Sequence, residues 1–414
     1  MAEPERVLRF GIAGVAAASG EAKSIAAHPF CTIAAAADRS QANLDKFIAQ
    51  YPCDTYRDVE SMCAAPDVDA VFIGTPTQFH FEHAMVALAH GKHVILAKPM
   101  ATRLDEAQRM VEEAERRGVW FSIGHTQGFE PPIFRMREII ESGEIGRIWL
   151  INTWNYTDWI YRGRVPEELD STLGGGVVFR QGAHQLDIVR WIGGGLVRSV
   201  RAMTGVWDPE RPAEGIYSAF LEFEDGAVAA CTFNGYDHFH SAELGFALGE
   251  GGQPIRNVNP GGARAALQRA QASPEGELAY KVARRSGEIR PQAAASPADG
   301  AGGGPAERFH SFYGLTVVSG EHGDMRQSPT GLLIYDDQGK REVEIHRGMD
   351  GRDVMIHQFY EAVVGGHPPP HDGRWGLATL ELQLAILESG RSRREVELTH
   401  QVAARTGSIN TIPS

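Results

Sequence analysis

The sequence predicts two domains of different class: an α/β domain on a parallel sheet, followed by a mixed domain on an open, mostly antiparallel sheet. In residues 1–127, short apolar runs alternate with amphipathic segments, which is typical of parallel strands covered by helices on both faces. From about residue 148, longer segments alternate polar and apolar residues, as strands with one buried face do. The 414 residues are enough for two cores, and we expect the second domain to span 128–414.

Five short apolar runs are the expected strands of the first domain: 7–14, 31–38, 69–74, 93–98 and 120–125. Between them, "QFHFEHAMVALAHG" (78–91) and "RLDEAQRMVEEAERRG" (103–118) have the spacing of amphipathic helices. Both segments end in glycine, as helix C-termini often do. This succession of strands and helices predicts a parallel sheet that is covered on both faces.

The second domain combines longer strands with few helices. We expect strands at 148–157 and 196–207, hairpins at 217–236 and 331–345, and a closing amphipathic helix at 372–390. Asp225-Gly226 is a favoured hairpin turn. Residues 250–308 are rich in Gly, Ala and Pro, and we expect them to form a mobile insertion around one short helix at 261–271.

Composition narrows the class of partner. The formal net charge is −13, which argues against nucleic acid because a phosphate backbone demands a Lys/Arg surface. We expect no secretory signal, because the first residues include acidic ones and no long apolar stretch, and no run approaches the roughly 20 apolar residues of a membrane span. The four cysteines form no CxxC pair and suggest reduced thiols in the cytoplasm. A small-molecule substrate is the expected partner.

The segment "GIAGVAAASG" (11–20) follows the first strand, where a dinucleotide-binding fold turns tightly around the pyrophosphate. Gly14 stands at the first glycine position of that fingerprint, whereas Ala16 and Ser19 replace the others, so an ordinary strand–helix turn is the competing interpretation. Asp38 ends the second strand 24 residues later (38 − 14), where an acid binds ribose hydroxyls. Asp38 favours NAD, and the adjacent Arg39 leaves NADP open.

Two longer motifs carry a family resemblance. "IGTPTQFHFEHAMVALAHGKHVILAKPMA" (73–101) and "LGGGVVFRQGAHQLDIVRW" (173–191) resemble the two signatures of the Gfo/Idh/MocA oxidoreductases. These signatures read T-P-x-x-x-H followed by G-K-H-V-x-x-E-K-P, and G-G-G-x-x-x-D-x-G-x-H-x-x-D. The chain departs from them at two positions, because Ala97 replaces the glutamate and Arg180 replaces the first aspartate.

The resemblance implies a Rossmann dinucleotide-binding domain and a second domain whose open sheet binds substrate on one face and a further subunit on the other. A homo-oligomer, dimer or tetramer, is therefore expected. The residues that the resemblance assigns to the cofactor are Gly14, Val15, Ala16, Asp38, Arg39, Thr75, Pro76, His80 and Lys98. The middle and C-terminal segments resemble a branch of the family that oxidises cis-dihydrodiols of aromatic carboxylates of the phthalate type to catechols.

Oxidising an alcohol needs a base within hydrogen-bond reach of the hydroxyl and a hydride acceptor that faces the C–H bond. Lys98 lies where a parallel strand ends, the edge at which open α/β sheets bind ligands, and burial beside a nicotinamide cation lowers a lysine pKa. His184 stands at the family's second catalytic position. Asp187, three residues later, is a candidate for substrate binding; it could orient the His184 ring or bind a backbone or arginine group instead. His125 ends the last expected strand and is a candidate for substrate contact or for a structural hydrogen bond.

Arg180 suggests an anionic substrate, because a guanidinium is suited to a carboxylate. Arg162 and Arg164 add positive charge to the preceding loop, although each could instead form a solvated ion pair with Glu167 or Glu168. The flat side chains expected to contact a cyclic substrate are Tyr156, Trp159 and Tyr161.

Three functions fit these residues. The first is an NAD-dependent dehydrogenase of aromatic cis-dihydrodiol carboxylates, and the second is a sugar or cyclitol dehydrogenase of the same family. The third is a non-catalytic nucleotide-sensing protein, which the substitutions at Ala97 and Arg180 would fit. No metal is expected, because His238 and His240 share a strand face without partners at metal-ligand spacing.

Overall fold

The structure is a computed structural model that describes residues 6–236, 238–255, 259–272, 276–286 and 309–405. The chain divides into two compact units. Unit 1 comprises Met1–Phe129, Met349–Glu381 and Ala404–Ser414, and unit 2 comprises Glu130–Gly348 and Leu382–Ala403. The sequence predicts that all of 128–414 belongs to the second domain, whereas the structure places Met349–Glu381 in unit 1.

Unit 1 is built on a six-stranded sheet in the order β3-β2-β1-β4-β5-β6, and every neighbouring pair is parallel. The strands are β1 (Leu8–Ala13), β2 (Cys31–Ala37), β3 (Asp54–Tyr56), β4 (Ala70–Ile73), β5 (His93–Ala97) and β6 (Phe121–Gly124). This is the strand order of a doubly wound dinucleotide-binding fold. The predicted Rossmann architecture is therefore confirmed.

Helices cover this sheet. Their apolar residues recur at helical spacing, so that each helix has an apolar stripe that it buries against the sheet. These helices are α1 (Ser19–Ala27), α2 (Gln41–Ile48), α3 (Val59–Cys63), α4 (His80–Ala89), α5 (Leu104–Arg117) and α10 (Gly351–Gly365), with the first part of α11 (Gly373–Ser392). In α5, Ala107, Met110, Val111 and Ala114 are the buried stripe. Helix α10 joins unit 1 because it packs on α1, where Arg352 pairs with Glu21. This packing joins residues far apart in the sequence, which explains why the pattern did not predict it.

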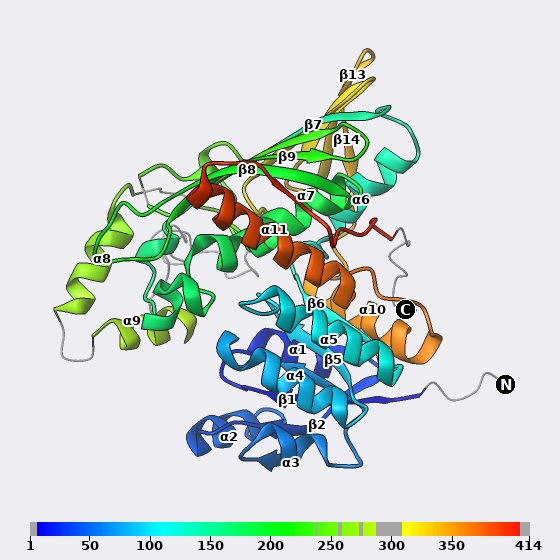
Figure 1. Ribbon diagram of the computed structural model, residues 1–414, viewed down its shortest axis with the longest axis vertical. Helices are drawn as coiled ribbons and strands as arrows, with labels where there is room; N and C mark the ends of the chain where they lie inside the picture. The colour runs from blue at the N-terminus through cyan, green and yellow to red at the C-terminus, as the bar shows by residue number, and fades with distance from the viewer. Residues whose placement is uncertain (1–5, 237, 256–258, 273–275, 287–308, 406–414) are drawn as a thin grey trace, which may run out of the picture. The chain divides into compact units, whose positions relative to one another are not determined.

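Unit 2 is built on a nine-stranded sheet in the order β14-β13-β12-β11-β7-β10-β9-β8-β15 (Figure 1). The strands are β7 (Ile148–Tyr156), β8 (Val197–Gly205), β9 (Ile216–Phe223), β10 (Val228–Asn234), β11 (Leu315–Gly320), β12 (Gly323–Gln327), β13 (Gly331–Asp336), β14 (Gly339–Glu344) and β15 (Val396–Glu397). Among the described ladders of this sheet, only the β7–β10 pair is parallel. The predicted mostly antiparallel sheet is confirmed.

The two faces of this sheet differ. Helices α6 (Pro131–Glu141) and α7 (Ala183–Ile192) pack against each other, and all ten residues of α7 are buried. Gln185 of α7 donates to Thr153 of β7, so the odd-numbered residues near the end of β7 face α7. On β8 and β9, Met203 and Phe220 remain 42% and 50% exposed. The sheet therefore has one face packed on helices and one face that carries exposed apolar residues.

The insertion contains two helices in its described part, α8 (Gly262–Gln271) and α9 (Gly276–Ser286). The expected short helix coincides with α8, whereas α9 is additional. Both helices pack on other parts of unit 2, and Glu277 of α9 pairs with the buried Arg211. The rest of the expected mobile stretch, 287–308, lies outside the described residues. Across the described ranges, no helix is both long and apolar enough to span a membrane.

Candidate active site

The β1–α1 turn makes the cradle for a dinucleotide. Gly14 has φ +80°, and a Cβ there would lie 2.8–2.9 Å from the backbone of Gly74 and Thr75. A larger residue would therefore separate the turns that follow β1 and β4. Helix α1 begins just beyond, and its N-cap Ala18 makes no side-chain cap hydrogen bond. Its first N–H groups suit the pyrophosphate of a dinucleotide, and these residues fit such a cofactor.

Asp38 directly follows β2, at the position that sequence analysis expects. Its Oδ1 accepts from the Ser40 backbone N–H at 2.8 Å and from the Asn43 amide at 3.3 Å, which holds the carboxylate in place. Arg39 is exposed, and its guanidinium lies 5.4 Å from the centre of the Phe79 ring. These hydrogen bonds therefore hold the Asp38 carboxylate in place, and the Arg39 guanidinium lies over the Phe79 ring.

His80 joins two loops at this edge. It is 1% exposed, and its Nδ1 and Nε2 lie 2.8 Å from the carbonyl oxygens of Pro99 and Thr75. Because carbonyl oxygens only accept, the ring makes both hydrogen bonds when both nitrogens carry a proton. His80 was predicted to contact the cofactor, and the structure shows it holding the Thr75–Pro76 loop against the turn that carries Lys98.

Lys98 is the residue directly after β5 and is partly exposed. The peptide bond to Pro99 is cis, and the Pro99 carbonyl is the one that His80 holds. Lys98 thus lies at the carboxyl edge of the parallel sheet, where the Gly14 turn and the Thr75 loop also lie. In open α/β sheets this edge is where ligands bind.

His125 follows β6 but is buried rather than open. It is 2% exposed, its ring centre lies 6.3 Å from that of His371, and His371 in turn packs at 4.1 Å on Phe129. Of the two interpretations of His125, this aromatic cluster favours the structural one.

The glycines before α7 allow close packing. Gly174 and Gly176 have φ values of +78° and +79°, and a Cβ on Gly176 would overlap the Glu214 carboxyl group. Glu214 also accepts from the Val178 backbone N–H at 3.2 Å. The five residues Val178–Gly182 form a π-helical turn that continues into α7. Such turns are rare and frequently occur at functional sites.

His184 opens α7 beside a residue that sequence analysis missed. The His184 ring is 9% exposed and meets the Tyr313 ring edge-on at 5.4 Å. The Tyr313 hydroxyl donates to the backbone and side-chain oxygens of Gln181 at 2.9 and 2.7 Å. Burial raises the Tyr313 pKa well above its ordinary value, so the hydroxyl stays protonated. Asp187 is fully buried, which favours an orienting role over ligand contact.

Arg180 projects from the π-helical turn into a cluster around Glu168. Its guanidinium lies 3.1 Å from the Glu168 carboxylate, which also pairs with Arg164 at 3.7 Å and with Lys281. Burial alone would raise the Glu168 pKa, but these three cations lower it to about 2. Arg180 is 25% exposed, against 11% for Arg164 and 13% for Lys281. Of this cluster, Arg180 is the cation most open to a ligand.

Arg164 is held more tightly than its neighbours. Its guanidinium donates to the Trp159 carbonyl oxygen at 2.9 and 3.2 Å and stacks 3.8 Å from the centre of the Trp159 ring. Burial, together with Arg162 and Arg180, lowers its pKa to about 9 despite the opposing effect of Glu168. The alternative of an ion pair with Glu168 is therefore present in the structure, but the pair is buried rather than solvated.

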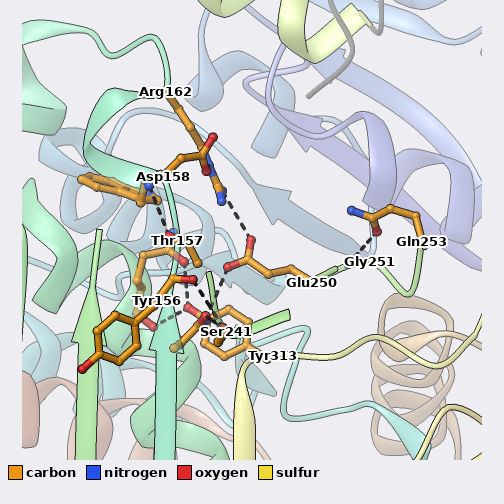
Figure 2. A network of polar contacts seen from close by, with 12 residues as sticks. Tyr156, Thr157, Asp158, Arg162, Ser241, Glu250, Gly251, Gln253 and Tyr313 are labelled. Atoms are coloured by element: carbon orange, nitrogen blue, oxygen red, sulfur yellow. Dashed lines mark hydrogen bonds and ion pairs between the residues drawn. The ribbon is translucent and has the colours of Figure 1, made fainter. Parts of the chain in front are cut away.

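Arg162 belongs to a second network, which Figure 2 shows from close by. It pairs with Asp158 at 2.7 Å and with Glu250 at 3.3 Å. Glu250 also accepts from the Asn155 amide at 3.5 Å. Glu250 begins the insertion and was not predicted, because no motif in the sequence distinguishes it from other loop acids.

The aromatic residues predicted for substrate contact are separated. Tyr156 follows Asn155 on β7, so it faces the opposite side of the sheet, and in Figure 2 its ring points away from Glu250. The Tyr161 hydroxyl donates to Asp208 at 3.0 Å, and burial followed by this hydrogen bond raises its pKa to about 12. Trp159 is 2% exposed. The structure thus does not gather these three rings around one ligand.

Comparison with known proteins identifies the family. Residues 8–125 match the model of the oxidoreductase family with an NAD-binding Rossmann fold (GFO_IDH_MocA), and residues 133–252 match the Gfo/Idh/MocA C-terminal domain. The chain belongs to the Gfo/Idh/MocA family of oxidoreductases. It is an NAD-dependent dehydrogenase.

Two relatives match over most of their length. The chain is 38% identical over 366 residues to the 1-carboxy-3-chloro-3,4-dihydroxycyclohexa-1,5-diene dehydrogenase of Comamonas testosteroni, covering 87% of this chain and 88% of that one. It is also 38% identical to a dehydrogenase from Bordetella bronchiseptica RB50 whose crystal structure is known. The TM-score is 0.84, and the match covers 95% of this chain and 100% of that one.

A more distant structure shares the fold alone. This is the WlbA dehydrogenase of Bordetella pertussis in complex with NADH and UDP-GlcNAcA, with 20% identity, a TM-score of 0.67 and coverage of 95% and 99%.

Proposed function

We propose that the protein oxidises the cis-dihydrodiol of an aromatic carboxylate, of the 4,5-dihydroxy-4,5-dihydrophthalate type, to the catechol. The observation that carries the proposal is Arg180. It replaces the family's aspartate, it lies one turn before His184, and its guanidinium is partly exposed within a cluster of cations. A guanidinium at this position suits a carboxylate, whereas a neutral sugar offers it no charged group to bind. The Comamonas relative, whose name describes a carboxylated dihydroxycyclohexadiene, supports the same substrate class.

Each proposed role is supported by the motif that contains the residue and by its position within its own unit. Bound NAD supplies the hydride acceptor. Lys98 takes the proton of the hydroxyl that is oxidised, and His184 binds the substrate hydroxyls while Tyr313 and Gln181 keep its ring in place. Arg180 binds the ring carboxylate. The substrate loses one hydride and one proton, and the resulting hydroxydienone tautomerises to a catechol, so aromatisation drives the reaction forward.

The cofactor-binding roles stay with the residues of unit 1. The Gly14 turn and the first N–H groups of α1 suit the pyrophosphate, and Asp38 suits the hydroxyls of the adenosine ribose. Val15, Ala16, Thr75 and Pro76 line the same turns through their backbone. His80 acts through Thr75 and Pro99 rather than by direct contact.

We also propose a homo-oligomer that forms through the exposed face of the nine-stranded sheet. The exposed Met203 and Phe220 on neighbouring strands support this proposal, because large apolar patches on a surface commonly mark interfaces. A cytoplasmic location is supported by the four cysteines, all of which are free thiols.

The test follows both products at once. The purified protein is given NAD and a carboxylated cis-dihydrodiol, an uncharged cis-dihydrodiol or a cyclitol. NADH is measured by absorbance and the catechol by chromatography. We expect NADH and catechol in equal amounts from the carboxylated substrate. Turnover of the cyclitol alone would refute the proposal and favour a sugar or cyclitol dehydrogenase. NAD binding without turnover of any of the three substrates would also refute the proposed substrate.

A further inference from the structure

Helix α9 lies directly against the loop that carries Arg162 and Arg164. A Cβ on Gly163 would lie 2.8 Å from the backbone nitrogen of Lys281 and 2.9 Å from its Cα and Cβ. The backbone of Gly163 is outside the left-handed region, so an alanine could adopt it. The small residue at 163 therefore lets α9 approach the arginine loop.

Glu277 joins the first turn of α9 to the same loop. Its carboxylate accepts from the Arg164 backbone N–H at 2.6 Å and from the Arg211 guanidinium at 2.6 and 2.9 Å. Arg211 is 4% exposed, so this pair is withdrawn from solvent. Glu277 thus fixes both the backbone of Arg164 and the start of α9.

Lys281 brings α9 to the carboxylate that also binds Arg180. Its ammonium pairs with Glu168, which is 6% exposed and also pairs with Arg164 and Arg180. Because the three cations share one carboxylate, Lys281 weakens the hold of Glu168 on Arg180. Without Lys281, Glu168 would bind Arg180 more strongly and draw its guanidinium away from a ligand.

We infer that α9, a helix of the insertion, is a substrate-recognition element for carboxylates, with Gly163, Glu277 and Lys281 as positioning residues for Arg164 and Arg180. The choice of ligand class rests on the proposed function. The physical basis is independent of it: α9 sets the backbone of one arginine and shares the carboxylate partner of the other. Helix α9 thereby contributes to carboxylate recognition in unit 2.

Binding can be measured without turnover. Calorimetry of the full chain with NADH would compare phthalate, a dianion that cannot be oxidised here, with the uncharged phthalamide. The variants are Gly163→Ala, which displaces α9, and Lys281→Met, which removes the shared charge. Val282→Ser is the matched control, because Val282 is on α9 and 58% exposed. Thermal unfolding and NADH affinity report whether each variant is folded.

We expect both test variants to bind phthalate about 10-fold more weakly, which is the low end for one charge-assisted hydrogen bond. The control should bind phthalate as the unmodified protein does, and all variants should keep their NADH affinity. Unchanged phthalate affinity in both test variants would overturn the inference. So would an equal loss for phthalamide, or no phthalate binding by the unmodified protein.

Kinetics separate this inference from the proposed function. With a carboxylated dihydrodiol, Lys281→Met should raise KM and leave kcat nearly unchanged, because Lys281 orients the binding arginine and does not touch the reacting atoms. If phthalate binding depends on α9 but no dihydrodiol is oxidised, the proposed function fails and the inference stands. If the dihydrodiol is oxidised and neither variant changes kcat/KM or phthalate affinity, the inference fails and the function stands.

Discussion

Replacing Arg180 by Met should remove carboxylate recognition without unfolding the protein. Breaking a buried ion pair commonly costs about 3–5 kcal/mol, because the remaining charge is left buried. Here Glu168 keeps Arg164 and Lys281, and Arg180 is 25% exposed. We therefore expect the free energy of unfolding to fall by less than about 1 kcal/mol. The lost bond to a substrate carboxylate should cost roughly 1.5–3 kcal/mol, or about 10- to 150-fold in kcat/KM.

The assay compares two dihydrodiols that differ only in the ring carboxylates. Arg180→Met should lose most of its kcat/KM on the carboxylated substrate and little on the uncharged one. Arg180→Lys should restore part of the loss, because an ammonium lacks the planar fork of a guanidinium. Denaturant unfolding of each variant checks stability. Equal losses on the two substrates would refute carboxylate binding and leave Arg180 as a structural partner of Glu168.

Three further predictions concern the base, the cofactor and stability. Lys98→Ala should lower kcat about 100- to 10,000-fold with nearly unchanged NAD affinity, and near-normal kcat would contradict its role as the base. Asp38→Ala should weaken NAD and relatively improve NADP in steady-state kinetics; a preference for NADP in the unmodified protein would show that Arg39 dominates instead. Burial, then the nearby His357, lowers the His28 pKa from 6.5 to about 4. The folded protein therefore binds fewer protons than the unfolded chain in that range, and stability, complete above pH 6.5, should fall as pH drops toward 4. Urea unfolding of His28→Phe should show a smaller loss over the same range, and an equal loss would assign the effect to other groups.

Much of the fold could be predicted because local patterns determine it. Strands β4 and β6 are runs of four buried residues, which periodicity detects directly. By contrast, β3 is three residues long with no buried position, so no hydrophobic signal predicts it. The packing of α10 on α1 depends on contacts between residues more than 300 positions apart. A pattern read along the chain carries no information about such pairs.

In the candidate site too, some residues could be predicted from local motifs and others only from the folded structure. Motif position was enough to single out Lys98, His184 and Arg180. Tyr313 was missed, and Glu168 was expected only as a partner of the loop arginines, because a buried tyrosine and a loop acid carry no further signal until the fold brings them to His184 and Arg180. The prediction that three aromatic side chains contact one substrate differs most from the structure. Tyr156 lies on the other face of its strand, and its neighbour in the chain takes part in the network instead.

The most direct test of the account is the substrate preference of the unmodified protein. Initial rates of NADH formation would be measured over a range of concentrations of a ring-carboxylated cis-dihydrodiol and of its uncharged analogue, at saturating NAD. We expect kcat/KM to be at least about 10-fold higher for the carboxylated substrate, because one charge-assisted hydrogen bond contributes roughly 1.5–3 kcal/mol. Equal values, or a higher value for the uncharged substrate, would contradict the claim that this dehydrogenase is built for an aromatic dihydrodiol carboxylate.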